Sequence, residues 1–68
     1  MKNFGEKLKD LRHAHKLSQQ EASSRIGITR SAYANYEQGL REPDLDTLKK
    51  ICLLYDITAD YLLGIDEN

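Results

Sequence analysis

The sequence predicts an all-α domain, a compact bundle of five short helices. Apolar residues recur at the three-to-four-residue spacing of amphipathic helices, strand-type alternation is scarce, and turn signals divide the chain into short segments. The chain has 68 residues, which is enough for one small domain that must pack closely to be stable. We expect residues 1–65 to form this domain and residues 66–68 to be a short acidic tail.

The first predicted helix runs roughly from Asn3 to His15. Phe4, Leu8 and Leu11 recur at the spacing of one helical stripe, which indicates a single buried face. Leu17 is the next apolar anchor.

The second predicted helix begins at Ser18 and ends at Gly27. Ser18 and Glu21 have the spacing of a capping box, in which each side chain accepts a hydrogen bond from the other residue's backbone amide. Ala22 and Ile26 mark the inner face, and Gly27 suits a left-handed turn that needs no Cβ.

The third predicted helix covers residues 29–38, with Thr29 as its cap and Gly39 after its end. On a helical wheel, Tyr33 and Tyr36 share the apolar face, so we expect both rings to pack inward and their hydroxyls to reach the rim. The opposite face carries small or short polar side chains: Ser31, Ala34, Asn35 and Gln38, flanked by Arg30 and Glu37.

The fourth predicted helix starts at the cap Asp44, after Pro43, and ends at Asp56. Its apolar stripe consists of Leu45, Leu48, Ile51, Cys52 and Tyr55. A short fifth helix begins at the cap Thr58 and stops at Gly64. Four apolar residues of this last part either close the monomer core or form a dimer contact: Ile57, Leu62, Leu63 and Ile65.

The second and third helices, joined by a short turn with Gly27, have the pattern of a helix-turn-helix. Ser23 is the small residue needed where the helices cross, and Ile28 fills the corner of the turn. The outer face of the third helix would then project as a rigid ridge of a size that fits the DNA major groove.

Residues 4–64 resemble the Xre-type helix-turn-helix family, the Cro- and phage-repressor-like DNA-binding domains. The matching segments are LSQQEASSRIGITRSAYANYEQGLREPDLDTLKKI and ITADYLLG, and the Y-E-x-G-x-x-x-P segment from Tyr36 to Pro43 is the most specific. The resemblance implies a lambda-repressor-like fold. The sequence departs from the family at Ala22 and Ser23, where Leu and Ala are usual, and we expect the two tyrosines of the third helix to fill the space at Ala22. It also departs at Lys16, where many relatives end the first helix with Gly, so the resemblance implies a left-handed lysine at a cost of about 1 kcal/mol.

The resemblance also implies the roles of individual residues. Base contacts fall to Arg30, Ser31 and Asn35, with Ala34 placed for a thymine methyl group. Phosphate contacts fall to Gln19, Gln38 and Arg41, and the helix starts at Ser18 and Thr29 add backbone amides that attract anions. A structural ion pair is implied between Arg12 and Glu37.

Composition limits the function classes. Net charge is −1, but residues 1–36 carry seven basic and three acidic residues, and residues 37–68 carry three basic and eight acidic residues. Cys52 is the single cysteine, which excludes an internal disulfide and favours a cytoplasmic setting. No run of apolar residues is long enough to predict a membrane span. His13 and His15 project to different helix faces, and the acidic residues match no metal loop, so no metal or other cofactor is expected.

We therefore predict a transcriptional regulator, a repressor, that binds double-stranded DNA sequence-specifically through residues 29–38. One such module contacts few bases, so a homodimer on a palindromic operator is expected, without a membrane or small-molecule partner. We do not expect an enzyme, because the sequence shows neither a catalytic nucleophile paired with a general base nor a phosphate-binding loop. The alternative is a protein-interaction module of the antitoxin or anti-repressor type, whose basic partner would suit the acidic second half.

Overall fold

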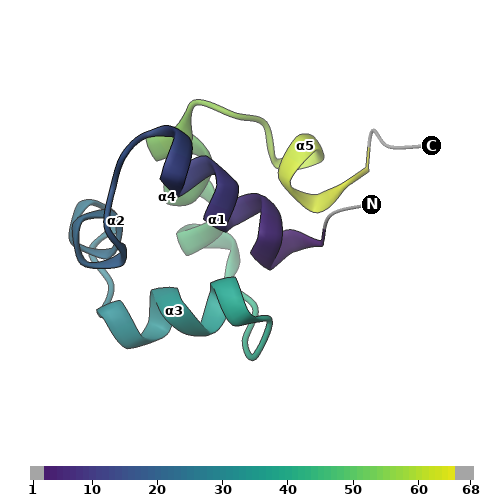
Figure 1. Ribbon diagram of the computed structural model, residues 1–68. Helices are drawn as coiled ribbons and strands as arrows, with labels where there is room; N and C mark the ends of the chain where they lie inside the picture. Colours follow the sequence, from purple (N-terminus) through teal and green to yellow (C-terminus); the bar gives the residue numbers. More distant parts are fainter. Residues whose placement is uncertain (1–2, 66–68) are drawn as a thin grey trace.

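The computed structural model describes residues 3–65, which contain five α-helices joined by short turns and loops. The predicted tail, residues 66–68, lies outside the described residues. No strand occurs in the described part, so the all-α prediction is confirmed (Figure 1). The helices are α1 (Phe4–Ala14), α2 (Gln19–Ile26), α3 (Arg30–Gln38), α4 (Leu45–Tyr55) and α5 (Ala59–Leu63).

Side-chain caps set the start of every helix. In each case the side-chain oxygen of the cap accepts a hydrogen bond of 2.8–3.1 Å from the amide three residues later. Ser18 and Glu21 form the predicted capping box. Thr29 caps α3 and so lies one residue outside the helix predicted to include it. The caps are Asn3, Ser18, Thr29, Asp44 and Thr58.

Left-handed residues end most of the helices. Gly27, Gly39 and Gly64 have φ values of 87°, 77° and 77°, where glycine avoids the clash of a Cβ. Lys16 has the predicted left-handed conformation, with φ of 58°. Asp56 is also left-handed, with φ of 54°. The sequence predicted that the helix ends at Asp56 but not that this residue is left-handed.

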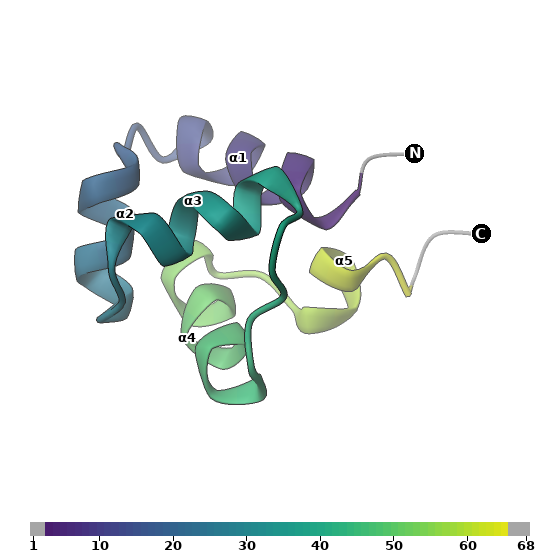
Figure 2. The same ribbon diagram turned by 90° about the horizontal axis from the view of Figure 1, so that it is seen from below.

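The core lies between α1, α3 and α4, with α2 and α5 at the two ends (Figures 1 and 2). Leu8, Ile51 and Leu62 are almost completely buried in it. Phe4, Leu11 and Leu48 are half-buried and pack against this cluster. The remaining members are Leu17, Ala22, Ile26, Tyr33 and Tyr55.

One expectation about apolar residues needs correction, and one open question is partly answered. Leu45 is 83% exposed although it belongs to the predicted stripe of α4, and it lines two surface grooves. The four apolar residues around α5 divide into two pairs. Ile57 and Leu62 pack in or against the monomer core, whereas Leu63 and Ile65 are 51% and 63% exposed.

Candidate nucleic-acid interface

The outer face of α3 is open to solvent along its length. Seen from below, α3 crosses the front of the molecule and no other described helix covers it (Figure 2). Arg30 and Ser31 are exposed at its start, and Ala34 and Asn35 are half-buried one turn later. The structure therefore brings the four predicted base-contacting residues together on one short helix.

Tyr33 anchors α3 from the opposite side. Its ring is completely buried, and Tyr36 is half-buried against the same core, so the inward packing of both tyrosines is confirmed. The predicted position of the hydroxyls at the rim is wrong for Tyr33, because Tyr55 of α4 offers a buried hydroxyl 2.6 Å away. Burial raises the pKa of both Tyr33 and Tyr55. Ala22 belongs to the core cluster that contains Tyr33.

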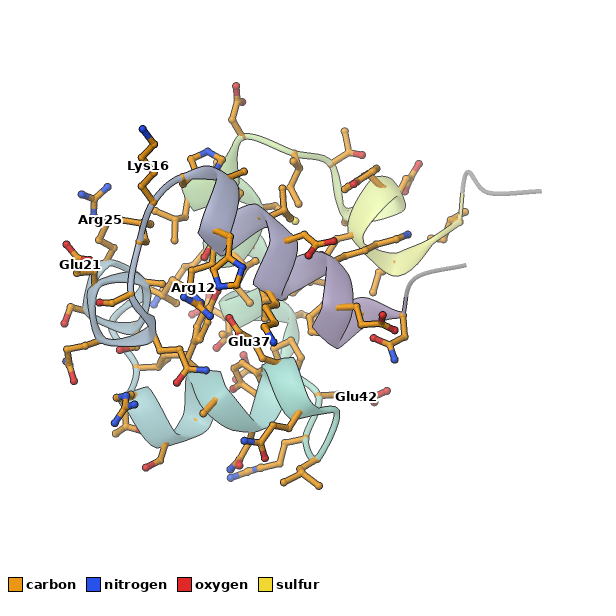
Figure 3. The ribbon with its side chains drawn as sticks, viewed as in Figure 1. Arg12, Lys16, Glu21, Arg25, Glu37 and Glu42 are labelled. Atoms are coloured by element: carbon orange, nitrogen blue, oxygen red, sulfur yellow. The ribbon has the colours of Figure 1, made fainter. Side chains whose placement is uncertain are left out.

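Arg12 and Glu37 form a two-pronged ion pair between α1 and α3 (Figure 3). Arg12 Nε lies 2.7 Å from Glu37 Oε2, and Arg12 Nη2 donates to Glu37 Oε1 at 3.2 Å. The side chains are only 11% and 4% exposed. Arg12 Nη1 also donates to the carbonyl of Leu17 at 2.9 Å, which ties the turn before α2 into the same network. The hydrogen bond to Glu37 raises the pKa of Arg12.

Gln19, a predicted phosphate contact, reaches this network from the start of α2. Its Nε2 donates to Glu37 Oε1 at 3.1 Å, and the side chain is half-buried. This bond could not be predicted from the sequence, because the packing of α2 against α3 brings residues 19 and 37 together.

The other predicted phosphate contacts are exposed: Ser18, Thr29, Gln38 and Arg41. The hydroxyl oxygens of Ser18 and Thr29 accept hydrogen bonds from helix amides. The O–H of Thr29 remains available to a phosphate oxygen, whereas the O–H of Ser18 interacts with the Glu21 carboxylate. Arg41 lies in the loop after α3 and lines a groove of about 610 Å³ together with residues of α1, α4 and α5.

Gly5 is a positioning residue that sequence analysis missed. A Cβ built at Gly5 would lie 2.3 Å from the carbonyl oxygen of Glu37, so α1 and the last turn of α3 are in backbone contact there. A glycine within the first turn of an amphipathic helix was the available signal. This contact sets the distance between α1 and the last turn of α3.

Several basic residues of the first half do not serve this surface. Lys7 is only 4% exposed and donates to the carbonyl of Tyr61 at 3.0 Å, and Arg12 is paired with Glu37. Lys16 and Arg25 point outward, away from α3 (Figure 3). Arg30 is the basic residue of α3 itself. The excess of basic residues in the first half therefore overstates the positive charge near α3.

Neither a metal centre nor a membrane segment is found in the described part. No group of three His, Cys, Asp or Glu residues there is placed to hold a metal ion. None of the helices in residues 3–65 is long and apolar enough to span a bilayer. Cys52 is half-buried against the core, and burial raises its pKa.

Comparison with known proteins places this geometry in a family. A family model described as Helix-turn-helix matches residues 8–62. The HTH-type transcriptional regulator YqaE of Bacillus subtilis is 48% identical over 65 residues, which are 96% of this chain and 56% of the relative. The chain spans about half the length of the curated relatives it matches.

Two solved structures share the fold. The controller protein C.AhdI of a restriction-modification system from Aeromonas hydrophila superposes with a TM-score of 0.82 at 33% identity, covering 88% of this chain and 91% of that one. The P22 c2 repressor, crystallised with a synthetic operator, superposes with a TM-score of 0.91 at 24% identity, covering 97% of this chain and 100% of that one. From its matched residues and its fold, this chain belongs to the helix-turn-helix family, of the Xre type.

Proposed function

We propose that this chain is the DNA-binding part of a transcriptional repressor and that α3 enters the major groove of double-stranded DNA. The observation that carries the proposal is an uncovered helix whose back is fixed by Tyr33 and whose front presents Arg30 and Ser31. Arginine can bind guanine through two hydrogen bonds, and Asn35 can do the same with adenine. Ala34 leaves room for a thymine methyl group.

The phosphate contacts in this proposal come from both ends of the helix pair. The backbone amides of Gln19 and Gln20 have no hydrogen-bond partner among the described residues, as is usual for the first turn of a helix. Such amides, together with the helix dipole, attract a phosphate without a lysine. Ser18, Gln19, Thr29, Gln38 and Arg41 would add side-chain contacts at the rim of the groove.

We propose that two copies act together on a palindromic operator, since one module reads few base pairs. Exposed leucines and isoleucines beyond α3 provide apolar surface for pairing: Leu45, Leu53, Leu63 and Ile65. Repression is the expected outcome, because a dimer seated on the operator excludes other proteins from the same groove. The protein would act by binding alone, without catalysis, in the cytoplasm where its DNA lies. Residues 1–65 would form the DNA-binding domain and residues 66–68 an acidic tail.

A protein-interaction module of the antitoxin or anti-repressor type is the second candidate. The same exposed apolar residues favour it, as does the excess of acidic over basic residues after residue 36. A module of this kind would bind a basic protein and would have no need of the α3 surface.

A gel mobility shift with duplex DNA at about 50 and 200 mM salt separates the two. If basic side chains displace counterions from phosphates, affinity should fall about tenfold or more between these salt concentrations. Lys50→Ala removes one positive charge from α4, and Arg30→Ala removes one from α3. Only the second should weaken binding. Absent binding would favour the protein-interaction module, and equal losses in both variants would contradict the entry of α3 into the groove.

A further inference from the structure

The carboxylate of Glu37 is fixed by three hydrogen bonds in a nearly closed site. Oε2 accepts from Arg12 Nε at 2.7 Å, and Oε1 accepts from Arg12 Nη2 at 3.2 Å and from Gln19 Nε2 at 3.1 Å. The Glu37 side chain is 4% exposed. The negative charge is matched by Arg12, so a phosphate that approaches nearby meets a neutral pair.

Gln19 keeps a donor after this bond is made. A side-chain amide carries two N–H donors on its nitrogen and an acceptor on its oxygen. One N–H of Gln19 is used by Glu37, and the other has no partner among the described residues. Because a carboxylate only accepts hydrogen bonds, contact with Glu37 selects the nitrogen side of the amide and disfavours the flipped arrangement.

This orientation matters for an anion at the start of α2. Gln19 is the first residue of that helix, and the backbone amides of Gln19 and Gln20 also lack partners among the described residues. A phosphate oxygen only accepts hydrogen bonds, so it needs the nitrogen of Gln19 and not its oxygen. A freely rotating amide would offer the oxygen part of the time.

We propose that Glu37 is a positioning residue for DNA binding. Its carboxylate, held by Arg12, fixes the Gln19 side-chain amide with one N–H left to donate to a backbone phosphate. The inference rests on the proposed function and gives Glu37 a role beyond joining α1 to α3. It also makes the two contacts of Gln19 compatible. The hydrogen bond to Glu37 orients the amide and leaves its second N–H for the phosphate.

The test is a double-mutant cycle read at a single phosphate. Gln19→Ala, Glu37→Gln and the double variant are measured on a duplex that the wild-type chain selects, with each phosphate replaced in turn by an uncharged methylphosphonate. In the wild type, replacement of the phosphate at Gln19 should weaken binding about tenfold. Both single variants should lose this penalty, and the double variant should bind no more weakly than either. Binding is compared only under conditions where each variant is folded.

The matched control is Ser24→Ala, also on α2. Ser24 is exposed and accepts a hydrogen bond from the Gln20 side chain on its own helix, so its replacement should change affinity less than twofold. Additive losses in the cycle, or a penalty at the same phosphate that persists in Glu37→Gln, would overturn the inference. If the wild-type chain bound no duplex at all, the proposed function would fail as well.

A second measurement needs no substitution and covers the case in which Glu37→Gln does not fold. Side-chain amide relaxation by NMR on the wild-type chain compares Gln19 with Gln20. The Gln19 amide should be rigid and slow to exchange, and the Gln20 amide, held only by an exposed serine, should be mobile. Equal mobility of the two amides would contradict the positioning role.

Discussion

Tyr33 and Arg30 lie three residues apart on the same helix, and the first is buried whereas the second is exposed. Tyr33 is buried and shares a hydrogen bond with Tyr55, so α3 is tied to α4 by a polar bond within an apolar core. Burial raises the pKa of both hydroxyls, which keeps them neutral as the pH rises past the range where an exposed tyrosine ionises. Arg30 is exposed and owes its position to this anchor.

Tyr33→Phe should lower the free energy of unfolding by about 1–3 kcal/mol, because it leaves the buried hydroxyl of Tyr55 without its partner. The double variant Tyr33→Phe with Tyr55→Phe removes both polar groups and should be more stable than the single variant. Urea denaturation followed by circular dichroism gives both values. A double variant that is less stable than the single one would contradict this account of the pair.

Gln38→Ala should weaken DNA binding by a similar factor on every sequence. Gln38 is the exposed last residue of α3, placed for phosphate, and a phosphate contact carries no sequence information. The expected loss is about 1 kcal/mol. Affinities for the operator and for an unrelated duplex, measured side by side, check it. A changed ratio between the two would instead place Gln38 on a base.

At the scale of the helices, capping was readable from sequence because it depends on residues close together in the chain. Ser18 and Glu21 define the start of α2 by spacing alone. Apart from the ion pair of Arg12 and Glu37, which the family resemblance implied, the contacts between helices were not readable in this way. The hydroxyl pair of Tyr33 and Tyr55 and the bond from Gln19 to Glu37 join residues 22 and 18 positions apart, so they depend on how the helices cross. The apolar stripe of α4 also did not show which of its residues other helices would bury, and Leu45 is exposed.

Gly5→Ala should destabilise the domain although alanine favours helices more than glycine. The new methyl group would lie 2.3 Å from the Glu37 carbonyl oxygen, a backbone atom that cannot move aside cheaply. Overpacking costs about 1–3 kcal/mol and outweighs a helix-propensity gain of about 1 kcal/mol at most. Thermal unfolding measures the net effect. Lys9→Ala, an exposed position on α1, is the control and should change stability little. A stabilised Gly5→Ala would show that α1 and α3 are not in backbone contact.

The capping box of α2 should make stability depend on pH in the acid range. Hydrogen bonds from the amide and hydroxyl of Ser18 lower the pKa of Glu21 below its ordinary value of 4.5. A carboxyl group whose pKa is lower in the folded state stabilises the fold above its unfolded value, and that contribution is lost as pH falls through the folded value. The stability difference between wild type and Glu21→Gln should therefore shrink below about pH 4.5. Urea denaturation between pH 7 and pH 3 tests this, and a constant difference would contradict it.

At the scale of the molecule, the basic residues of the first half of the sequence do not all lie near α3. Lys7 and Arg12 are used inside the fold, where one meets the carbonyl of Tyr61 and the other meets Glu37. Counting basic residues along the chain could not separate these from Arg30, because only the packed structure shows which of them face α3. The candidate interface therefore depends on a few placed side chains and helix starts more than on net charge.

The central claim is that the outer face of α3 reads base pairs. Selection of duplex DNA from a random pool, carried out in parallel with the wild type and Arg30→Ala, tests it most directly. The wild type should select a palindrome, and Arg30→Ala should lose the preference at one base pair of each half-site, with a loss of about 1–3 kcal/mol on the wild-type site. An unchanged selected sequence in Arg30→Ala would contradict the claim.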